Sequence, residues 1–431
     1  MPLRQRLLPG SLLLAMLLSL PVIAAEDGDW GDDWDDEQQT AQAPSPWQFS
    51  GFIEGAFGDF LQTNIAANHK SLNELRSRIK VDHSHDKFEL TASGDLLYDD
   101  ILNDTIWHTR ELNIAASPLA NLDIKLGRQI LTWGTGDYLF LNDLFAKDWQ
   151  SFFAGRDDEY LKAPSDSARV TGYIKAVTID LAWTPEFAPD NYLNGERFSF
   201  YSPQAQQLVA PAEHFRVNTT NKDQWSIRLA TNQEGIEYAL YGYHGVFNTP
   251  QAVDEQGVAY FPPINAFGGS IRMPLASGVF NSEFSVYNST SDSKGNNPFI
   301  ANGQVRFLLG YEQELVKNLT ASAQYYLEKT SDYNAFEATS PNPAIVVDEY
   351  RQLLTLRLRY TAMQQKLTYS LFSFYSPTDQ DSYIRPSISY RKNDSWLFSA
   401  GANLFNGKDN FSFFGQHQDN SNIWARVRLV F

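Results

Sequence analysis

Strict alternation of apolar and polar residues is the feature that most constrains how this chain can fold. In KFELTASGDLLY, residues 87–98, apolar side chains fall at nearly every second position, with polar side chains between them. LTASAQYYLE, residues 319–328, and LLTLRLRY, residues 353–360, repeat the pattern. Because successive side chains of a β-strand point to opposite faces, this period predicts strands with one apolar and one polar face.

About eighteen such segments fill the chain from residue 47 to its end, which indicates an all-β protein. No apolar run of about 18 residues occurs within this region, so the sequence argues against membrane-spanning helices there. We expect the strands at 47–60, 72–82, 87–98, 105–116, 121–133, 168–176, 178–185, 224–231, 235–246, 265–274, 278–290, 302–315, 318–329, 350–362, 365–375, 382–392, 395–405 and 423–431.

The connections between these segments alternate in length. Turns such as HSHD, TNQE and MQQK are short, whereas long connections cover 61–71, 134–167, 186–223, 247–264, 291–301, 330–349 and 406–422. This alternation is typical of an outer-membrane barrel, and a sheet in lipid must close because lipid offers its edges no hydrogen-bond partner. We therefore predict a transmembrane antiparallel up-and-down β-barrel over residues 47–431, with about 18 strands and 16 as the alternative. A soluble two-sheet sandwich rarely needs so many strands.

The C-terminal segment IWARVRLVF alternates to its last residue, Phe431. It resembles the terminal strand of bacterial outer-membrane proteins, whose final aromatic residue is read by the barrel-assembly machinery. The resemblance implies that Phe431 is an assembly signal and that this machinery is a partner.

The N-terminal region carries targeting information. Arg4 and Arg6 precede the apolar run LLPGSLLLAMLLSLPVIA, and small residues favour cleavage after Ala24 or Ala25, so we predict a signal peptide over 1–25. Eight of the twelve residues from Glu26 are acidic, which predicts a disordered tail over 26–46. An even strand number places both termini in the periplasm, where Trp30 and Trp34 could contact a basic partner; a solvating spacer is the alternative reading of the tail.

The polar faces of the strands are expected to line a lumen. The alternation predicts a basic wall that consists of Arg76, Arg78, Lys80, Arg351, Arg357, Arg359, Arg385, Arg391, Arg426 and Arg428. It predicts lumenal acids at Glu89, Asp95, Glu111 and Asp123, with Glu312, Glu314 and Glu328 on later strands. A basic wall near an acidic one creates a field that favours polar or anionic solutes. The alternative is that these charges pair across the lumen.

The connection after the fifth strand departs from the strand period. In LNDLFAKDWQSFF the apolar residues recur at helical spacing, which predicts a short amphipathic helix. Such a helix must pack on the barrel, on other loops, or inside the lumen as a constriction. The residues concerned are Leu141, Leu144, Phe145, Trp149, Phe152 and Phe153. The acidic run at Asp157, Asp158 and Glu159 is expected to be solvated rather than to bind calcium.

One short motif carries a family resemblance. GRQILTWG, residues 127–134, looks like the G-R-Q-x-x-x-W-G strand of porin-like Gram-negative outer-membrane barrels, which include alginate-export-like barrels and barrels encoded beside envelope export systems. The matching residues are Gly127, Arg128, Gln129, Trp133 and Gly134. The resemblance implies the barrel class and leaves the solute open.

Composition excludes several other functions. The chain has 34 Lys and Arg against 51 Asp and Glu, which argues against nonspecific nucleic-acid binding. It has no cysteine and no G-x-S-x-G, H-E-x-x-H or P-loop motif, so we expect no catalytic residues, metal or cofactor. The sequence predicts an outer-membrane porin-like channel for small polar or anionic solutes. The alternative is a barrel in a transenvelope export or lipid/polymer transport assembly that docks a periplasmic partner through its acidic tail.

Overall fold

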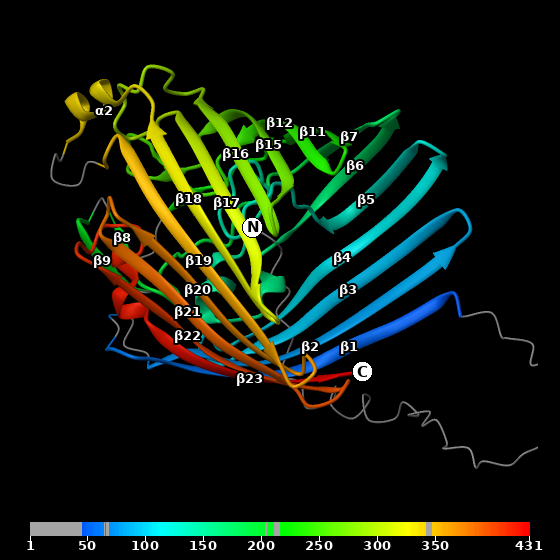
Figure 1. Cartoon of the computed structure of the whole chain (residues 1–431). Coiled ribbons are helices and arrows are strands. Elements are labelled where there is room, and N and C mark those ends of the chain that lie inside the picture. The colour runs from blue at the N-terminus through cyan, green and yellow to red at the C-terminus, as the bar shows by residue number, and fades with distance from the viewer. Residues whose placement is uncertain (1–44, 64, 66–68, 203–204, 211–215, 342–346) are drawn as a thin grey trace, which may run out of the picture.

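The computed structural model of this chain describes residues 45–431 apart from 64, 66–68, 203–204, 211–215 and 342–346. Its main feature is a closed barrel of 18 antiparallel strands (Figure 1). The first strand, β1 (Trp47–Phe60), pairs both with β2 (Lys70–His85) and with the last strand, β23 (Asn422–Val430), which closes the sheet. The predicted fold class is therefore confirmed with 18 strands rather than 16. The predicted signal peptide and nearly all of the acidic tail, including Trp30 and Trp34, lie outside the described residues.

Each predicted strand is present, with ends that differ by up to four residues. β5 stops at Ile130, before the expected end at 133, because the chain turns into the lumen there. The other barrel strands are β3 (Phe88–Asp99), β4 (Asp104–Leu119), β5 (Leu122–Ile130), β6 (Pro164–Ile174), β7 (Val177–Thr184), β11 (Gln224–Gln233), β12 (Ile236–Val246), β15 (Pro263–Leu275), β16 (Gly278–Ser289), β17 (Gln304–Val316), β18 (Leu319–Thr330), β19 (Tyr350–Ala362), β20 (Leu367–Ser376), β21 (Asp381–Arg391) and β22 (Trp396–Gly407).

The remaining elements lie in the connections. Two minor sheets are formed by β8 (Phe200–Ser202) with β9 (Gln207–Val209), and by β10 (Val217–Asn218), β13 (Ala252–Val253) and β14 (Ala259–Tyr260). The helical segments are α1 (Trp149–Ala154), η1 (Asp158–Tyr160), α2 (Tyr333–Thr339) and η3 (Gly415–Asn420). Among the described residues, no helix is long and apolar enough to cross a membrane.

The short turns share one rim of the barrel, which we call the short-turn rim, and the longer connections share the opposite long-loop rim. The β11–β12 turn has Glu234 and Gly235 at φ 54° and 84°, the left-handed conformation that two-residue hairpins need to match strand twist. The first residue of β1 and the last residue of β23 also lie at the short-turn rim, as an even number of strands requires.

The two faces of the sheet differ as the alternation predicts. On β1, Phe49, Ile53 and Phe57 point outward and are exposed, whereas Glu54 and Ala56 point inward and are buried. Aromatic side chains also lie on the outer face near strand ends, as in an interfacial girdle. Examples are Tyr98, Trp183, Trp225, Tyr360 and Trp396.

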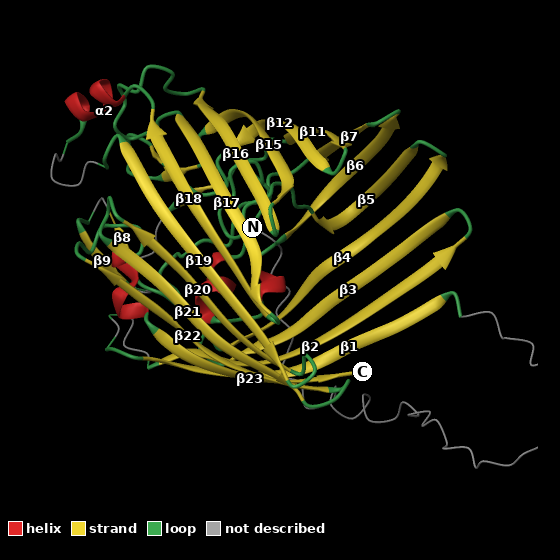
Figure 2. Ribbon diagram, viewed as in Figure 1, coloured by secondary structure: helices red, strands yellow, loops and turns green. Residues whose placement is uncertain are grey.

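The long connection from residue 131 to 163, here called the inner loop, enters the barrel. Figure 2 draws short helical segments inside the ring of strands, and hydrogen bonds join the inner loop to β2, β16 and β22. The predicted helix is shorter than its apolar pattern suggests. α1 covers six residues, and Leu141, Leu144 and Phe145 precede it in non-helical backbone.

Pairing with other segments explains this difference. Lys147 bridges to Lys162 and Asp148 bridges to Asn191, so the backbone before α1 bonds to other segments instead of to its own next turn. Asp148 then caps α1 by accepting a hydrogen bond from the backbone N–H of Ser151 at 2.7 Å. Gly155 ends the helix in a left-handed conformation, φ 80°.

Candidate constriction site

The apolar side of the inner loop packs on aromatic residues of the barrel wall. Phe152 and Phe153 are buried against Tyr383 of β21, and Phe153 also contacts Phe405 of β22 at a ring-centroid distance of 5.0 Å. Trp424 of β23 covers Gly155, where a Cβ atom would lie 2.2 Å from the indole. The apolar side chains at the end of α1 therefore pack against the inside of the barrel, toward the long-loop rim.

The other predicted residues of the stripe contact different parts of the wall. Phe145 packs against Ala182 of β7 and against Trp133 of the inner loop itself, at a ring-centroid distance of 4.9 Å, and Leu144 lies against a second cluster that includes Tyr243. Leu141 is buried, and its carbonyl accepts a hydrogen bond from the Tyr287 hydroxyl. The inner loop thus touches opposite sides of the lumen, because Tyr243 belongs to β12 and Tyr287 to β16, whereas Tyr383 belongs to β21.

The residues of the GRQILTWG motif shape the entry of this loop. Gly127 has φ +112°, and a Cβ there would lie 2.3 Å from the Leu112 carbonyl oxygen, so only glycine fits. Gln129 is buried and donates a hydrogen bond to the Ser167 carbonyl at 3.1 Å. Arg128 points outward and pairs with Asp166 at 3.4 Å. The motif is therefore structural in this barrel.

Glu283 of β16 anchors the first turn of the inner loop. Its carboxylate accepts hydrogen bonds from the backbone N–H groups of Thr135 and Gly136, and from the Asn142 side chain at 3.0 Å. Gly134, at φ +88°, turns the chain toward this carboxylate. Glu283 was not among the residues predicted from the sequence, although its inward-facing position on a strand could have indicated it.

The acidic run of the inner loop is partly exposed, as expected from the sequence, but each of its carboxylates is also paired with an arginine of the wall. Asp157 pairs with Arg426 at 3.1 Å, Asp158 with Arg385 at 3.0 Å, and Glu159 with Arg78 at 2.6 Å. Burial would raise the pKa of Asp157, but Arg426 and Arg428 outweigh burial and hold that pKa below its ordinary value. The run therefore bonds the inner loop to the wall.

The ten residues of the predicted basic wall lie on β2, β19, β21 and β23, which belong to one continuous side of the barrel. Most of them are neutralised by a carboxylate, which agrees with the pairing alternative. The pairs not yet described are Arg76 and Arg78 with Asp95, Lys80 with Asp82, Arg351 with Asp379, Arg357 with Asp137, and Arg428 with Glu54. Arg359 and Arg391 are exposed toward the short-turn rim.

The four predicted lumenal acids have different surroundings. Asp95 is fully buried, and the Tyr160 hydroxyl of the inner loop donates to it at 2.8 Å. Asp123 accepts from Ser117 and Tyr173, Glu111 accepts from Ser93, and Glu89 is exposed near the short-turn rim. Of these four, Asp95 is thus the one with a hydrogen bond to the inner loop.

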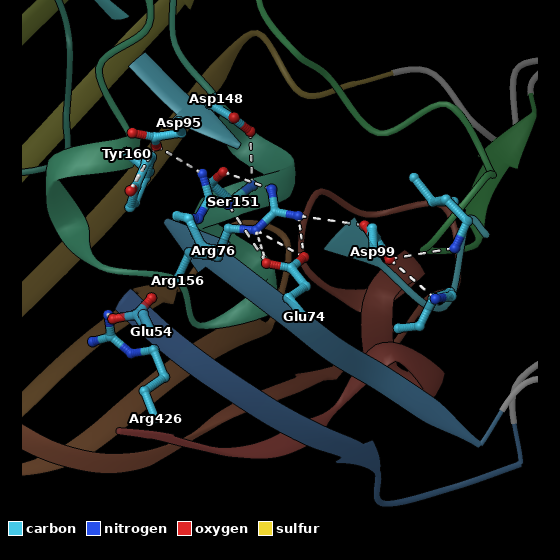
Figure 3. A network of polar contacts seen from close by, with 12 residues as sticks. Glu54, Glu74, Arg76, Asp95, Asp99, Asp148, Ser151, Arg156, Tyr160 and Arg426 are labelled. Carbon is cyan, nitrogen blue, oxygen red and sulfur yellow. Dashed lines mark hydrogen bonds and ion pairs between the residues drawn. The ribbon is translucent and has the colours of Figure 1, made fainter. Parts of the chain in front are cut away.

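A buried ion-pair network that the sequence analysis missed joins two loops to the wall (Figure 3). Glu74 of β2 accepts hydrogen bonds from Arg156 of the inner loop at 3.0 and 3.1 Å, and it lies 3.4 Å from Arg197. Arg197 belongs to the connection after β7 and also pairs with Asp99 of β3. The alternation could have identified Glu74 and Asp99, but Arg197 stands in a connection with no period.

A second loop-to-loop contact centres on Asp190. Its carboxylate accepts hydrogen bonds from the Lys147 backbone N–H and from the Trp149 indole, both at 2.8 Å. Burial raises the pKa of Asp190 to about 6, although Lys147 partly opposes this rise. A carboxyl whose pKa is higher when folded binds protons more tightly in the folded state, so its contribution to stability falls as pH rises from about 4 to 6.

The substitution Asp190→Asn should remove this pH dependence. The pKa of Asp190 is about two units higher in the folded state than in the unfolded state. We therefore expect the free energy of unfolding of the wild type, relative to that of the variant, to decrease by up to about 3 kcal/mol between pH 4 and pH 7. Thermal unfolding of both proteins, followed by circular dichroism at several pH values, measures the difference. Parallel pH profiles for the two proteins would contradict the assignment.

No protein-family model matches the chain, and no curated sequence is significantly similar to it. The fold is similar to solved outer-membrane porins. OccAB4 of Acinetobacter baumannii is 10% identical, with 90% of this chain and 98% of that chain covered and a TM-score of 0.57. OccD3 (OpdP) of Pseudomonas aeruginosa is 11% identical, with 89% and 90% covered and a TM-score of 0.53.

A third similar structure was solved with a ligand. OccK2 (OpdF) of Pseudomonas aeruginosa, in complex with glucuronate, is 9% identical, with 89% of this chain and 97% of that chain covered and a TM-score of 0.53. Identities this low establish a shared fold only. The resemblance of residues 127–134 to alginate-export-like barrels stays a prediction.

Proposed function

We propose that this chain is a porin-like channel that lets small polar solutes diffuse across the bacterial outer membrane. One observation carries the proposal: a closed 18-stranded barrel holds a loop that is anchored to several sides of its own lumen. Barrels of this size are wide enough to hold an aqueous channel, and an inserted loop narrows the channel without closing the sheet. The porin fold of the similar structures agrees with this function.

Recordings from planar lipid bilayers test the channel function directly. We expect the purified wild-type protein to produce discrete current steps in a salt solution, because water and ions can pass beside the inner loop. A refolded barrel that stays silent would contradict the proposal and favour a docking role.

The location follows from the two faces of the sheet. The apolar outer face suits lipid, and the short-turn rim with both described ends of the chain would face the periplasm. Phe431, the predicted assembly signal, exchanges two backbone hydrogen bonds with Gly51 of β1, at 2.9 and 3.0 Å. It therefore lies beside the pairing of the last strand with the first strand that closes the barrel. We expect the barrel-assembly machinery to act on this strand.

The predicted preference for anionic solutes has less support than the channel itself. That preference requires an open basic wall, whereas eight of the ten residues of the wall have a carboxylate partner within 4 Å. Glucuronate in the OccK2 complex is an anion, but the identity of 9% does not carry a ligand to this chain.

A docking role in a transenvelope export or lipid/polymer transport assembly is the second candidate. The acidic tail with Trp30 and Trp34 motivates it, because such a segment can fold on a basic periplasmic partner. Pull-down from periplasmic extract, with the full chain and with a variant that lacks residues 26–46, tests this role. A partner that binds only the full chain would support docking.

A further inference from the structure

The ion pairs between the inner loop and the barrel wall are unequal in exposure. The side chain of Asp158 is 55% exposed, whereas its partner Arg385 is 11% exposed. Glu159 is 35% exposed and contacts Arg428, which is 12% exposed. Asp157 is 30% exposed against 9% for Arg426. In each of these three pairs the carboxylate is more exposed than the guanidinium.

Aromatic rings explain why the arginines are covered. The guanidinium carbon of Arg385 lies 3.9 Å from the ring centroid of Phe152, and that of Arg428 lies 4.0 Å from the ring of Phe52. These cation–π contacts hold the positive groups against apolar surface, on the side away from water. Phe152 belongs to the inner loop, as Asp158 does, and Phe52 belongs to β1; the carboxylates are left as the more exposed groups of these pairs. Each pair is therefore a fixed dipole with its negative end toward the lumen.

A further exposed carboxylate belongs to a different part of the wall. Glu312 of β17 is 41% exposed and pairs with Arg357 of β19, which is 33% exposed and also contacts Asp137 of the inner loop at 2.9 Å. Arg357 is not covered as Arg385 is, but two acids, Glu312 and Asp137, share it. The negative potential therefore arises from geometry at Asp158 and from charge at Glu312.

We propose that the passage beside the inner loop selects for positively charged solutes, and that Asp158 and Glu312 set this preference. An ion in the passage is nearer to the exposed carboxylates than to the covered guanidinium groups, and Coulomb energy falls with distance. Small inorganic cations, and organic solutes that carry an ammonium group, meet a favourable electrostatic potential there. The proposal rests on the proposed channel function and reverses the anion preference that the sequence predicted.

The reversal potential of the current in a potassium chloride gradient measures this preference. We expect the wild-type channel to favour potassium over chloride, and Asp158→Asn or Glu312→Gln to reduce the permeability ratio about two- to fivefold, the effect of one partly screened charge. Asp166→Asn is the matched control, because Asp166 is an exposed, arginine-paired aspartate on the outer face of β6. It should leave the ratio unchanged.

The possible results separate the two proposals. A wild-type channel that prefers chloride would overturn the selectivity and leave the channel function intact. Cation preference that both lumenal variants retain in full would overturn the assignment to Asp158 and Glu312. A wild-type barrel that conducts no current would overturn the channel function itself. The circular dichroism spectrum of each variant confirms that its barrel has folded.

Discussion

Replacing residues 139–153 with a short flexible linker should raise the conductance of a single channel several-fold. This segment contains five of the six residues of α1 and most of the apolar residues that pack on the wall, including the buried Phe152 and Phe153. The strand pairing that closes the barrel does not involve it. Its removal should therefore widen the lumen and leave the sheet closed. Single-channel currents in planar bilayers measure the change.

A control replacement separates this effect from general loosening of the loops. α2 (Tyr333–Thr339) also lies in a long connection, but none of its residues is buried. Replacing residues 334–339 with the same kind of flexible linker that replaces residues 139–153 should leave the single-channel conductance unchanged. Equal conductance for the wild type and the variant that lacks 139–153 would mean that the current does not pass the inner loop.

Loss of the buried charge of Glu74 should cause the largest destabilisation among single substitutions in the lumen. Glu74→Gln keeps the shape of the side chain but leaves Arg156 and Arg197 with Asp99 as their remaining shared acid. Removing one partner of a buried ion pair costs about 3 kcal/mol or more, because the remaining charge stays desolvated. Both arginines belong to loops, so we also expect noisier channel currents.

Chemical denaturation of the refolded barrel measures the expected loss of stability. Glu89→Gln is the matched control, because Glu89 stands on the adjacent strand β3 and is exposed. It should change the free energy of unfolding by about 0.5 kcal/mol or less, as is usual for surface positions. Similar losses for both variants would contradict a special role for the network around Glu74.

The fold was largely predictable because the evidence for it is local. Alternation shows in any window of a few residues, and it indicated the strands, their faces and the order of short and long connections. The inner loop was predictable only in part. Its apolar stripe indicated a need for a packing surface, but spacing alone did not reveal that Leu141 and Phe145 would remain outside the helix. The backbone bridges from Lys147 to Lys162 and from Asp148 to Asn191 keep these residues out of the helix. Such pairings join distant positions, so no local sequence pattern predicts them.

The charged residues of the lumen were also predictable only in part from the sequence. The sequence by itself determined which side chains face inward, since the two-residue period of a strand leaves no choice once the outer face is apolar. It did not determine what they meet there. Asp157 and Arg426 are 269 positions apart, and Glu54 and Arg428 are 374 positions apart. Closure of the barrel and entry of the inner loop bring these groups together. The tertiary structure alone therefore decided that most of the basic wall is paired and that Asp158 is more exposed than its partner Arg385.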